Sequence, residues 1–463
     1  MPARPNLLVI QTDQQSCWTL GAYGGSVVGT PHIDSLAHEG VVFDQCFTNS
    51  AVCTPSRGCL VTGLHPEAHG AWHNELAMHP EVRTLADALG EAGYDTGYVG
   101  KWHLDGLPPE PPAWKPNDWT PVGLLPARPG WVPPERSRGF ADCRWMFQSS
   151  HAKGVVEAPG AERPRFSPDP GEGRFMTDWL ADKAIEFLSR PRSAPFFCML
   201  SIPDPHEPYA VREPYAGMYD PAAMPVPRSF REPRPPRWAS EGLEGCSSAL
   251  EGPDPEGELR RAMAAYCGEV KCIDDNVGRV LVELRALRLL DDTLVVFTSD
   301  HGDYMGEHGL YGKNRAFEAA YRIPMIMRWP MRLRAGTRVG RLASTVDFMP
   351  TALALLGLAC PGRVQGADAS AFAAGGSRDW DDAAFFGHSH FDLAGVFTRE
   401  FELALWRSGE GALFSRREDP EQLTNLFDEP AFAAVRRELR DRLVEHNRKT
   451  GSPAAEWLAC IPG

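Results

Sequence analysis

The stretch NLLVIQTDQQ, from Asn6 to Gln15, decides the fold class of this chain. Its apolar centre, Leu7 to Ile10, is short and is followed by polar, turn-forming residues. A continuous apolar run of this length is typical of a strand buried on both faces, as the strands of parallel sheets are. If similar segments recur along the chain, the stretch is one strand of an α/β sheet.

Similar segments do recur, and helical patterns separate them. The further short apolar runs bounded by turn residues are Tyr94–Gly100, Pro195–Ile202, Thr293–Asp300 and Ile323–Pro330. The segments with helical periodicity are Thr84–Gly93, Phe175–Arg190 and Gly257–Leu290. Strands that alternate with helices predict a large, mainly parallel sheet sandwiched by helices.

The pattern changes after about residue 357. Residues 383–391, 395–407 and 411–419 resemble short antiparallel strands, and residues 430–449 form a charged amphipathic helix. We therefore expect an α/β domain over residues 1–356 and a smaller C-terminal α+β subdomain over residues 357–463. Two segments rich in proline and arginine, 107–138 and 214–238, are expected to be long surface loops.

The composition narrows the class of protein. Hydrophobic residues make up 43% of the 463 residues and charged residues 23%, as in ordinary globular proteins, and the net charge is -14. A nucleic-acid partner is not expected, because proteins that bind nucleic acids usually show a basic face. The apolar runs are too short for a secretory signal or a membrane span. The eleven scattered cysteines fit reduced thiols, so we expect a cytoplasmic protein without a membrane partner.

Polar residues follow the predicted strands at the edge where open parallel sheets bind ligands. Two carboxylates, one amide oxygen and one imidazole form a candidate ligand set for a divalent cation: Asp13, Gln14, Asp300 and His301. Oxygen ligands favour calcium, magnesium or manganese, and the imidazole favours manganese or zinc. The alternative is that Asp13 and Asp300 only cap or turn the chain at the strand ends.

Three further stretches reveal a family resemblance. CTPSR, Cys53 to Arg57, resembles the Cys-x-Pro-Ser-Arg signature of the sulfatase family, which is part of the alkaline-phosphatase-like superfamily. GKWHL, from Gly100, and TSDHGDYMGEHGLYGK, from Thr298, resemble two other signatures of that family in the expected order. The opening strand is similar to the family's first strand and metal pair. For Cys53 the alternative is a buried structural thiol.

The resemblance implies that a formylglycine-generating enzyme oxidises Cys53 to formylglycine (3-oxoalanine), an aldehyde. The hydrated aldehyde is a geminal diol, and one hydroxyl attacks sulfur beside a divalent cation while the second later expels sulfate. The implied enzyme is a hydrolase of sulfate esters with a small anionic substrate. It would use one cation, which we expect to be calcium, with manganese or zinc as alternatives.

The resemblance also implies roles for the matching residues. Arg57 would hold the diol, and Lys101 and Lys313 would contact the sulfate oxygens. His103 would be the base for sulfate elimination, and His206, with Lys313, would protonate the leaving alcohol. A surface-loop histidine is the alternative for His206. Lys101 and His103 would share one face if the backbone there stays extended.

Three positions bear on the choice between activities. Asn74 is placed like a family residue that touches the transferred group, and a loop-capping asparagine is its alternative. Gln14 stands where many sulfatases carry aspartate, and His301 where many carry asparagine. Both variants resemble branches that hydrolyse phosphonate monoesters or phosphodiesters, which is the alternative activity. A third hypothesis is a non-catalytic binding protein on a sulfatase scaffold. The presence of every polar residue that the family resemblance leads us to expect argues against it.

Overall fold

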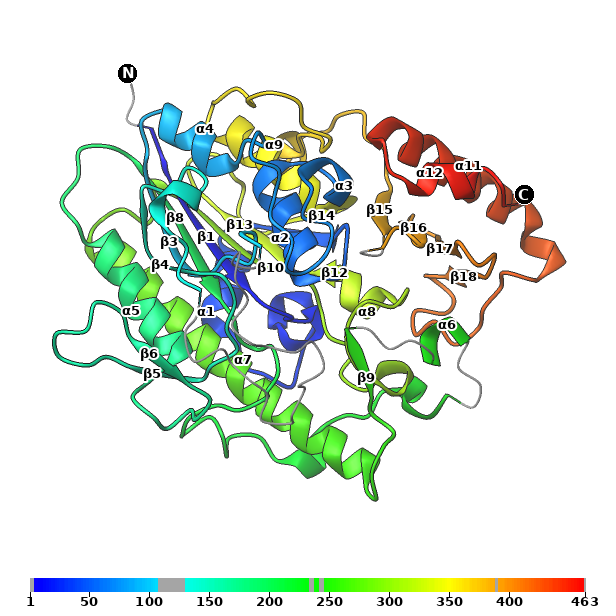
Figure 1. Cartoon of the computed structure of the whole chain (residues 1–463), viewed down its shortest axis with the longest axis horizontal. Coiled ribbons are helices and arrows are strands. Elements are labelled where there is room, and N and C mark those ends of the chain that lie inside the picture. The colour runs from blue at the N-terminus through cyan, green and yellow to red at the C-terminus, as the bar shows by residue number, and fades with distance from the viewer. Residues whose placement is uncertain (1–3, 107–129, 233–236, 241–244, 388–389, 462–463) are drawn as a thin grey trace.

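The computed structural model describes residues 4–106, 130–232, 237–240, 245–387 and 390–461 (Figure 1). Its centre is a nine-stranded sheet in the order β12-β2-β13-β10-β1-β8-β3-β4, with β14 beside β2. These strands are β1 (Asn6–Thr12), β2 (Val41–Phe47), β3 (Asp95–Lys101), β4 (Asp142–Phe147), β8 (Phe196–Ile202), β10 (Thr293–Ser299), β12 (Arg322–Ile323), β13 (Met325–Arg328) and β14 (Thr337–Ser344). The strands from β10 to β4 run parallel to one another, as predicted.

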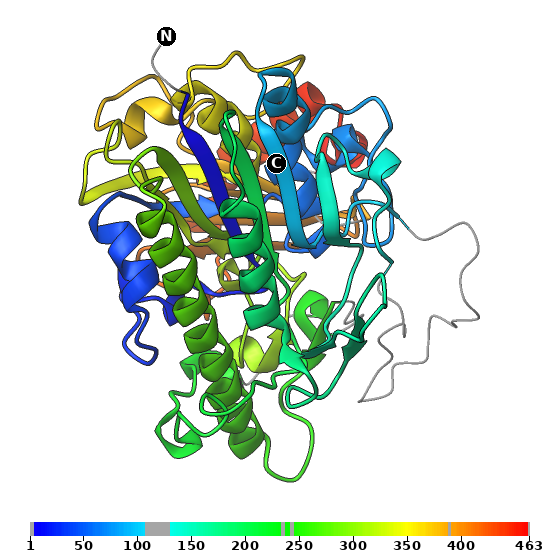
Figure 2. The same cartoon turned by 90° about the vertical axis from the view of Figure 1, so that its left-hand side faces the viewer.

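Helices cover both faces of this sheet, and the strand β1 shows why. Leu7 and Val9 enter one buried apolar cluster, while Leu8 and Ile10 enter another on the opposite face. The first cluster is covered by α2 (Cys53–Thr62), α4 (Leu85–Glu91) and α9 (Phe348–Leu355). The second is covered by α1 (Pro31–His38), α5 (Met176–Leu188) and α7 (Pro255–Ala286), and Figure 2 shows α5 and α7 lying across the strands.

The strand predicted over Ile323–Pro330 is wrong in its continuity. Pro324 lacks a backbone N–H and interrupts the segment, which becomes β12 and β13. Both strands pair antiparallel to their neighbours, so the sheet is mixed. The strands β2 and β14, which the sequence did not reveal, form the same edge of the sheet together with β12 and β13.

The helix α2 depends on packing rather than on helix propensity. Every residue of Cys53–Thr62 is buried, and its N-cap residue, Val52, has no side chain that could cap the helix. A Cβ atom on Gly58 would lie 2.4 Å from Cε1 of His69, so only glycine allows this contact. The packing fixes Cys53 at the first turn of the helix, facing the strand ends.

The C-terminal part contains the predicted antiparallel sheet and helix. Its strands are β15 (Ala384–Gly387), β16 (Leu393–Phe397), β17 (Phe401–Trp406) and β18 (Gly411–Ser415). One face packs against α11 (Ala433–Thr450) and α12 (Ala454–Leu458). The other face packs through Phe386 and Phe397 against Phe47 of β2 and against Tyr321, the last residue of α8 (Glu318–Tyr321). The boundary at residue 356 stays a prediction.

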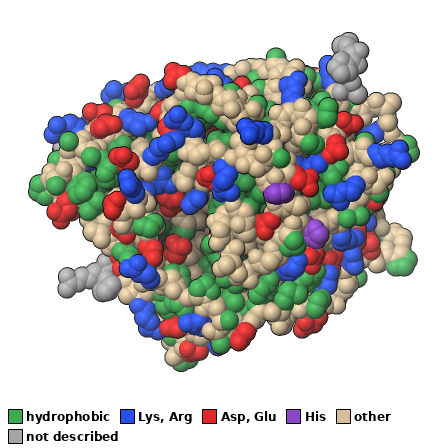
Figure 3. Space-filling view, turned by 180° about the vertical axis from the view of Figure 1, so that it is seen from behind, with side chains coloured by type: hydrophobic (Ala, Val, Ile, Leu, Met, Phe, Trp, Pro, Cys, Tyr) green, Lys and Arg blue, Asp and Glu red, His purple; other side chains and the backbone are tan. Residues whose placement is uncertain are grey.

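Most of the described residues of the two proline-rich segments are irregular, as expected of loops. Residues 107–129 of the first segment lie outside the described residues, and its remainder holds one short 3-10 helix, Pro134–Arg136. In the second segment, residues 214–232 contain turns and two more 3-10 helices, Pro221–Ala223 and Arg228–Arg231. Residues 233–236 lie outside the described residues, and residues 237–238 begin the short helix α6 (Arg237–Ser240), where no loop is found. None of the helices that the structure describes is long and apolar enough to cross a membrane. Acidic and basic side chains are interspersed over the face in Figure 3.

Candidate active site

The candidate site lies where the parallel strands end. Thr12 of β1 and Ser299 of β10 are paired in register, so Asp13 and Asp300 leave the sheet side by side. Cys53 faces them from the N-terminus of α2, because its Sγ lies 3.6 Å from Oδ1 of Asp13. Lys101 is the last residue of β3.

Four side chains form a compact set of potential metal ligands. One ligand atom from each of Asp13, Cys53, Asp300 and His301 lies within 4.8 Å of the others, and all four residues are buried. Nδ1 of His301 donates to the carbonyl of Gly302 at 2.9 Å, which leaves the lone pair of Nε2 facing the carboxylates. Two carboxylates and an imidazole presented in this way fit a divalent cation.

Three cations surround these two carboxylates. The Arg57 guanidinium donates to Asp300 at 2.9 Å and to Asp13 at 3.2 Å, and the Lys101 ammonium lies 2.5 Å from Asp13. Burial raises the pKa of the Asp13 carboxyl, but the neighbouring charges, Lys101 first, hold this pKa well below its usual value. With Lys313 as the third cation, the group has an excess of positive charge and is suited to an anion.

Lys313 joins the nucleophile position to the predicted acid. Its Nζ lies 3.4 Å from Sγ of Cys53 and 2.8 Å from Nε2 of His206. Nδ1 of His206 donates to the carbonyl of Glu207 at 2.9 Å, so Nε2 accepts the bond from Lys313. Burial, then His151 and Lys313, lower the pKa of His206 well below its usual value.

Gln14 is held beside Lys313. Its Oε1 accepts from Nζ of Lys313 at 2.6 Å, and its amide nitrogen donates to Glu207 at 2.6 Å and to Asp303 at 2.5 Å. The backbone N–H of Gln14 also donates to Oδ1 of Asp300, so the residue borders the metal-ligand set. Its role as a fourth ligand stays a prediction.

Asn74 and His103 both contact the first turn of α2. Oδ1 of Asn74 accepts from the backbone N–H of Thr54 at 3.1 Å, which is a capping contact and places the side chain beside Cys53. Oγ1 of Thr54 donates to the carbonyl of His103 at 2.8 Å. His103 has a φ of 60°, so the condition of an extended backbone from Lys101 to His103 is not met.

One histidine of the site was missed from the sequence. His151 stacks on His206 with ring centroids 3.9 Å apart and an angle of 24° between the planes. Burial and the charge of Lys101 lower its pKa well below the usual value. His151 follows the end of β4, so the rule that placed Asp13 and Asp300 would have found it had that strand been recognised.

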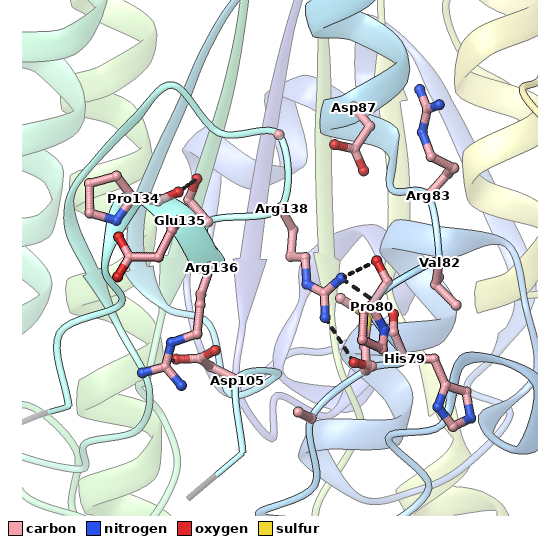
Figure 4. A pocket seen from close by; sticks show the side chains of 14 residues that line it. His79, Pro80, Val82, Arg83, Asp87, Asp105, Pro134, Glu135, Arg136 and Arg138 are labelled. Atoms are coloured by element: carbon pink, nitrogen blue, oxygen red, sulfur yellow. Dashed lines mark hydrogen bonds and ion pairs between the residues drawn. The ribbon is translucent and has the colours of Figure 1, made fainter. Parts of the chain in front are cut away.

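A separate cavity of about 790 Å³ does not contain the reacting groups. It is lined by residues 77–80, Val82, Arg83, Asp87, Asp105 and residues 134–139 (Figure 4). Its Arg138 guanidinium donates to the backbone carbonyls of residues 78, 79 and 80, and Arg136 pairs with Asp105 at 3.3 Å. These cations are already neutralised or hydrogen-bonded, so the cavity is not the candidate active site.

Comparison with known protein families identifies the family of this chain. A sequence model of the family described as Sulfatase matches residues 5–358. The chain belongs to the sulfatase family. A second model, described as N-sulphoglucosamine sulphohydrolase, C-terminal, matches residues 306–449 of this sulfatase.

Individual relatives cover nearly the whole sulfatase. N-acetylglucosamine-6-O-sulfatase from Bacteroides thetaiotaomicron is 25% identical over 517 residues, covering 96% of this chain and 87% of that protein. An ulvan-active sulfatase from Formosa agariphila is 27% identical, covering 96% and 81%. The solved phosphonate monoester hydrolase of Agrobacterium radiobacter is 27% identical with a TM-score of 0.76, and 96% of each chain is covered. The family, the fold class and the enzyme class, a sulfuric ester hydrolase, are thereby confirmed.

Proposed function

We propose that this sulfatase hydrolyses the sulfate ester of a small anionic substrate through a formylglycine made from Cys53. The observation that carries the proposal is the place of Cys53, at a buried helix start between Asp13, His301 and Lys313. A cation held by Asp13, Gln14, Asp300 and His301 would supply Lewis-acid activation of a hydroxyl group. The hydrated aldehyde would supply the hydroxyl that attacks sulfur and the one that later expels sulfate.

The residues of the chain would bind the substrate and move protons. Lys101 and Lys313 point their ammonium groups into the cluster around Cys53 and would hold sulfate oxygens as negative charge grows. Arg57 fixes the Asp13 and Asp300 carboxylates. His206 and Lys313 share one proton at 2.8 Å and would deliver it to the leaving oxygen. His103 would act as the base in sulfate release.

A phosphonate monoester or phosphodiester hydrolase is the second candidate function. Gln14 and His301 support it, and so does the similarity to the phosphonate monoester hydrolase structure. Lys101 and His103 support the sulfate ester, because the phosphonate branch carries hydroxyl residues in the signature that here reads GKWHL. Cytoplasmic location and maturation by a formylglycine-generating enzyme belong to the proposal.

Matched substrates test the two functions. We expect kcat/KM for 4-nitrophenyl sulfate to exceed that for 4-nitrophenyl phenylphosphonate and for bis-4-nitrophenyl phosphate. The opposite order would transfer the proposal to phosphorus esters. Mass spectrometry of the Cys53 peptide adds the maturation test, because conversion of the thiol to an aldehyde lowers the residue mass. An unmodified thiol in fully active protein would overturn the formylglycine mechanism.

Removal of the cation should lower activity and stability together. A cation present at 100 times its Kd stabilises the folded protein by about 2.7 kcal/mol, and a chelator should remove this contribution. Calcium should restore both quantities, and manganese and zinc are the comparison ions. Asp300→Asn should lose the bound metal. The matched control is Asp275→Asn, in the separate cluster of His32, Asp274 and Asp275, and it should keep the metal content of the wild-type protein. Equal metal content in the two variants would contradict the assigned ligands.

A further inference from the structure

A buried lysine outside the reacting group is bonded to the loop that carries His206. Lys153 is 0% exposed, and its Nζ lies 2.6 Å from Oδ1 of Asp204 and 2.7 Å from Oε1 of Glu269. The same Nζ donates to the backbone carbonyl of His206 at 3.1 Å. An ammonium has three donors, and all three are used here.

The partners of Lys153 tie both sides of this loop to the helical layer. Asp204 also accepts from Oγ1 of Thr177 on α5, and its carbonyl accepts from the N–H of Asp13. Glu269 of α7 accepts a second bond, from the backbone N–H of Ala210 at 2.8 Å. The chain from Asp204 to Ala210 is therefore anchored before and after His206.

The segment that carries Lys153 also contacts the ring of His206. His151, two residues earlier, stacks its ring on that of His206. Lys153 itself precedes the short strand β5 (Gly154–Val156) and donates its backbone N–H to the carbonyl of Ser167. The backbone and the ring of His206 are thus both held by residues 151–153.

The buried ion pairs of Lys153 with Asp204 and Glu269 favour one position of these side chains over others. A buried ammonium with two carboxylates contributes little net stability compared with apolar residues, because all three groups are desolvated. Such a group does restrict where its members can lie, because each loses its partners when displaced. The structural result is a fixed His206 backbone, with Nε2 2.8 Å from Lys313.

We propose that Lys153 is a positioning residue for proton donation to the leaving group. It acts through the backbone of His206 and touches neither the substrate nor the metal ligands. The proposal rests on the proposed function, in which His206 and Lys313 protonate the departing oxygen. Loss of Lys153 should therefore matter most for leaving groups that need a proton, and least for those that depart readily as anions.

A leaving-group series tests this in the full-length enzyme. The substrates are aryl sulfates from 4-nitrophenyl sulfate, whose leaving group is acidic, to phenyl sulfate and an alkyl sulfate, and the quantity is kcat/KM. Lys153→Met should lose up to about 10²-fold on the poorest leaving groups and almost nothing on 4-nitrophenyl sulfate. His206→Ala should show the same steeper dependence of kcat/KM on the leaving group, because it removes the imidazole that shares the proton with Lys313.

Two further variants separate positioning from folding. Lys153→Arg keeps the charge but offers a planar fork, which does not match three converging acceptors, and it should show a weaker form of the same dependence. Leu413 is a buried residue of β18 in the C-terminal sheet. Leu413→Ala should lower the melting temperature and leave the dependence of kcat/KM on the leaving group unchanged. If Lys153→Met does not fold, Lys153→Arg decides the question.

A uniform loss across the series, or no change in Lys153→Arg and Lys153→Met, would overturn the positioning role. These outcomes are distinct from failure of the proposed function. If the wild-type enzyme turns over no sulfate ester, the proposed function fails, and the same series of aryl phosphodiesters then tests Lys153. If the wild-type enzyme is active and the dependence is unchanged, only the role of Lys153 fails.

Discussion

Cys53→Ala should lower sulfate ester hydrolysis by roughly 10⁶-fold and leave the fold intact. The side chain at this position is the only group of the cluster that the family resemblance makes a nucleophile, and alanine offers none. The substitution removes one buried sulfur atom at the start of α2 and leaves the helix backbone and the Asn74 contact to Thr54 unchanged. Turnover of an aryl sulfate and the melting temperature are the measurements.

Cys59→Ala is the matched control, because Cys59 lies on the same helix and is equally buried, with its Sγ 3.8 Å from Nε2 of His69. It should cost stability and keep activity. Cys53→Ser should differ from alanine, because its hydroxyl can accept sulfate once and then stall. A sulfated peptide detected by mass spectrometry is the expected sign. Activity near the wild-type level in Cys53→Ala would end the formylglycine mechanism.

Buried strands were predictable from the sequence, and partly exposed edges were not. The strands β1, β8 and β10 contain apolar runs with both faces covered, so composition identifies them. The strand β2 contains half-buried Asp44 and Gln45, and β14 has exposed arginines and a register shift between Val339 and Leu342. Neither alternation nor a continuous apolar run marks such strands.

The reacting residues were predictable because they lie in short local motifs. The buried residues that position them were not predictable. Cys53 and Arg57 lie one turn apart on α2, and Asp300 and His301 are adjacent in the sequence. Lys153, in contrast, bonds Asp204 and Glu269, which are 51 and 116 residues away. Pairing over such distances depends on how α5 and α7 pack on the sheet, which single-sequence patterns do not specify.

Arg57→Met should destabilise the metal-free protein by about 3–5 kcal/mol, the usual cost of breaking a buried ion pair. The Arg57 side chain is 2% exposed and contacts both buried carboxylates, Asp13 and Asp300. Without it, Asp300 keeps only its backbone N–H donors, while Asp13 keeps Lys101. The free energy of unfolding of metal-free protein, from denaturant titration, measures the cost.

The same substitution should cost less when the cation is bound, because a dication between Asp13 and Asp300 offsets the charge that Arg57 leaves behind. Arg328→Met is the matched control. Arg328 is the last residue of β13, is also buried, and pairs with Glu39 at 2.9 Å and with Asp291 at 2.6 Å. Its cost should be the same with and without cation, because it contacts no proposed ligand. An equal cost of Arg57→Met in both states would mean that the cation does not bind between Asp13 and Asp300. A smaller cost in the loaded state would measure the coupling between Arg57 and the metal site directly.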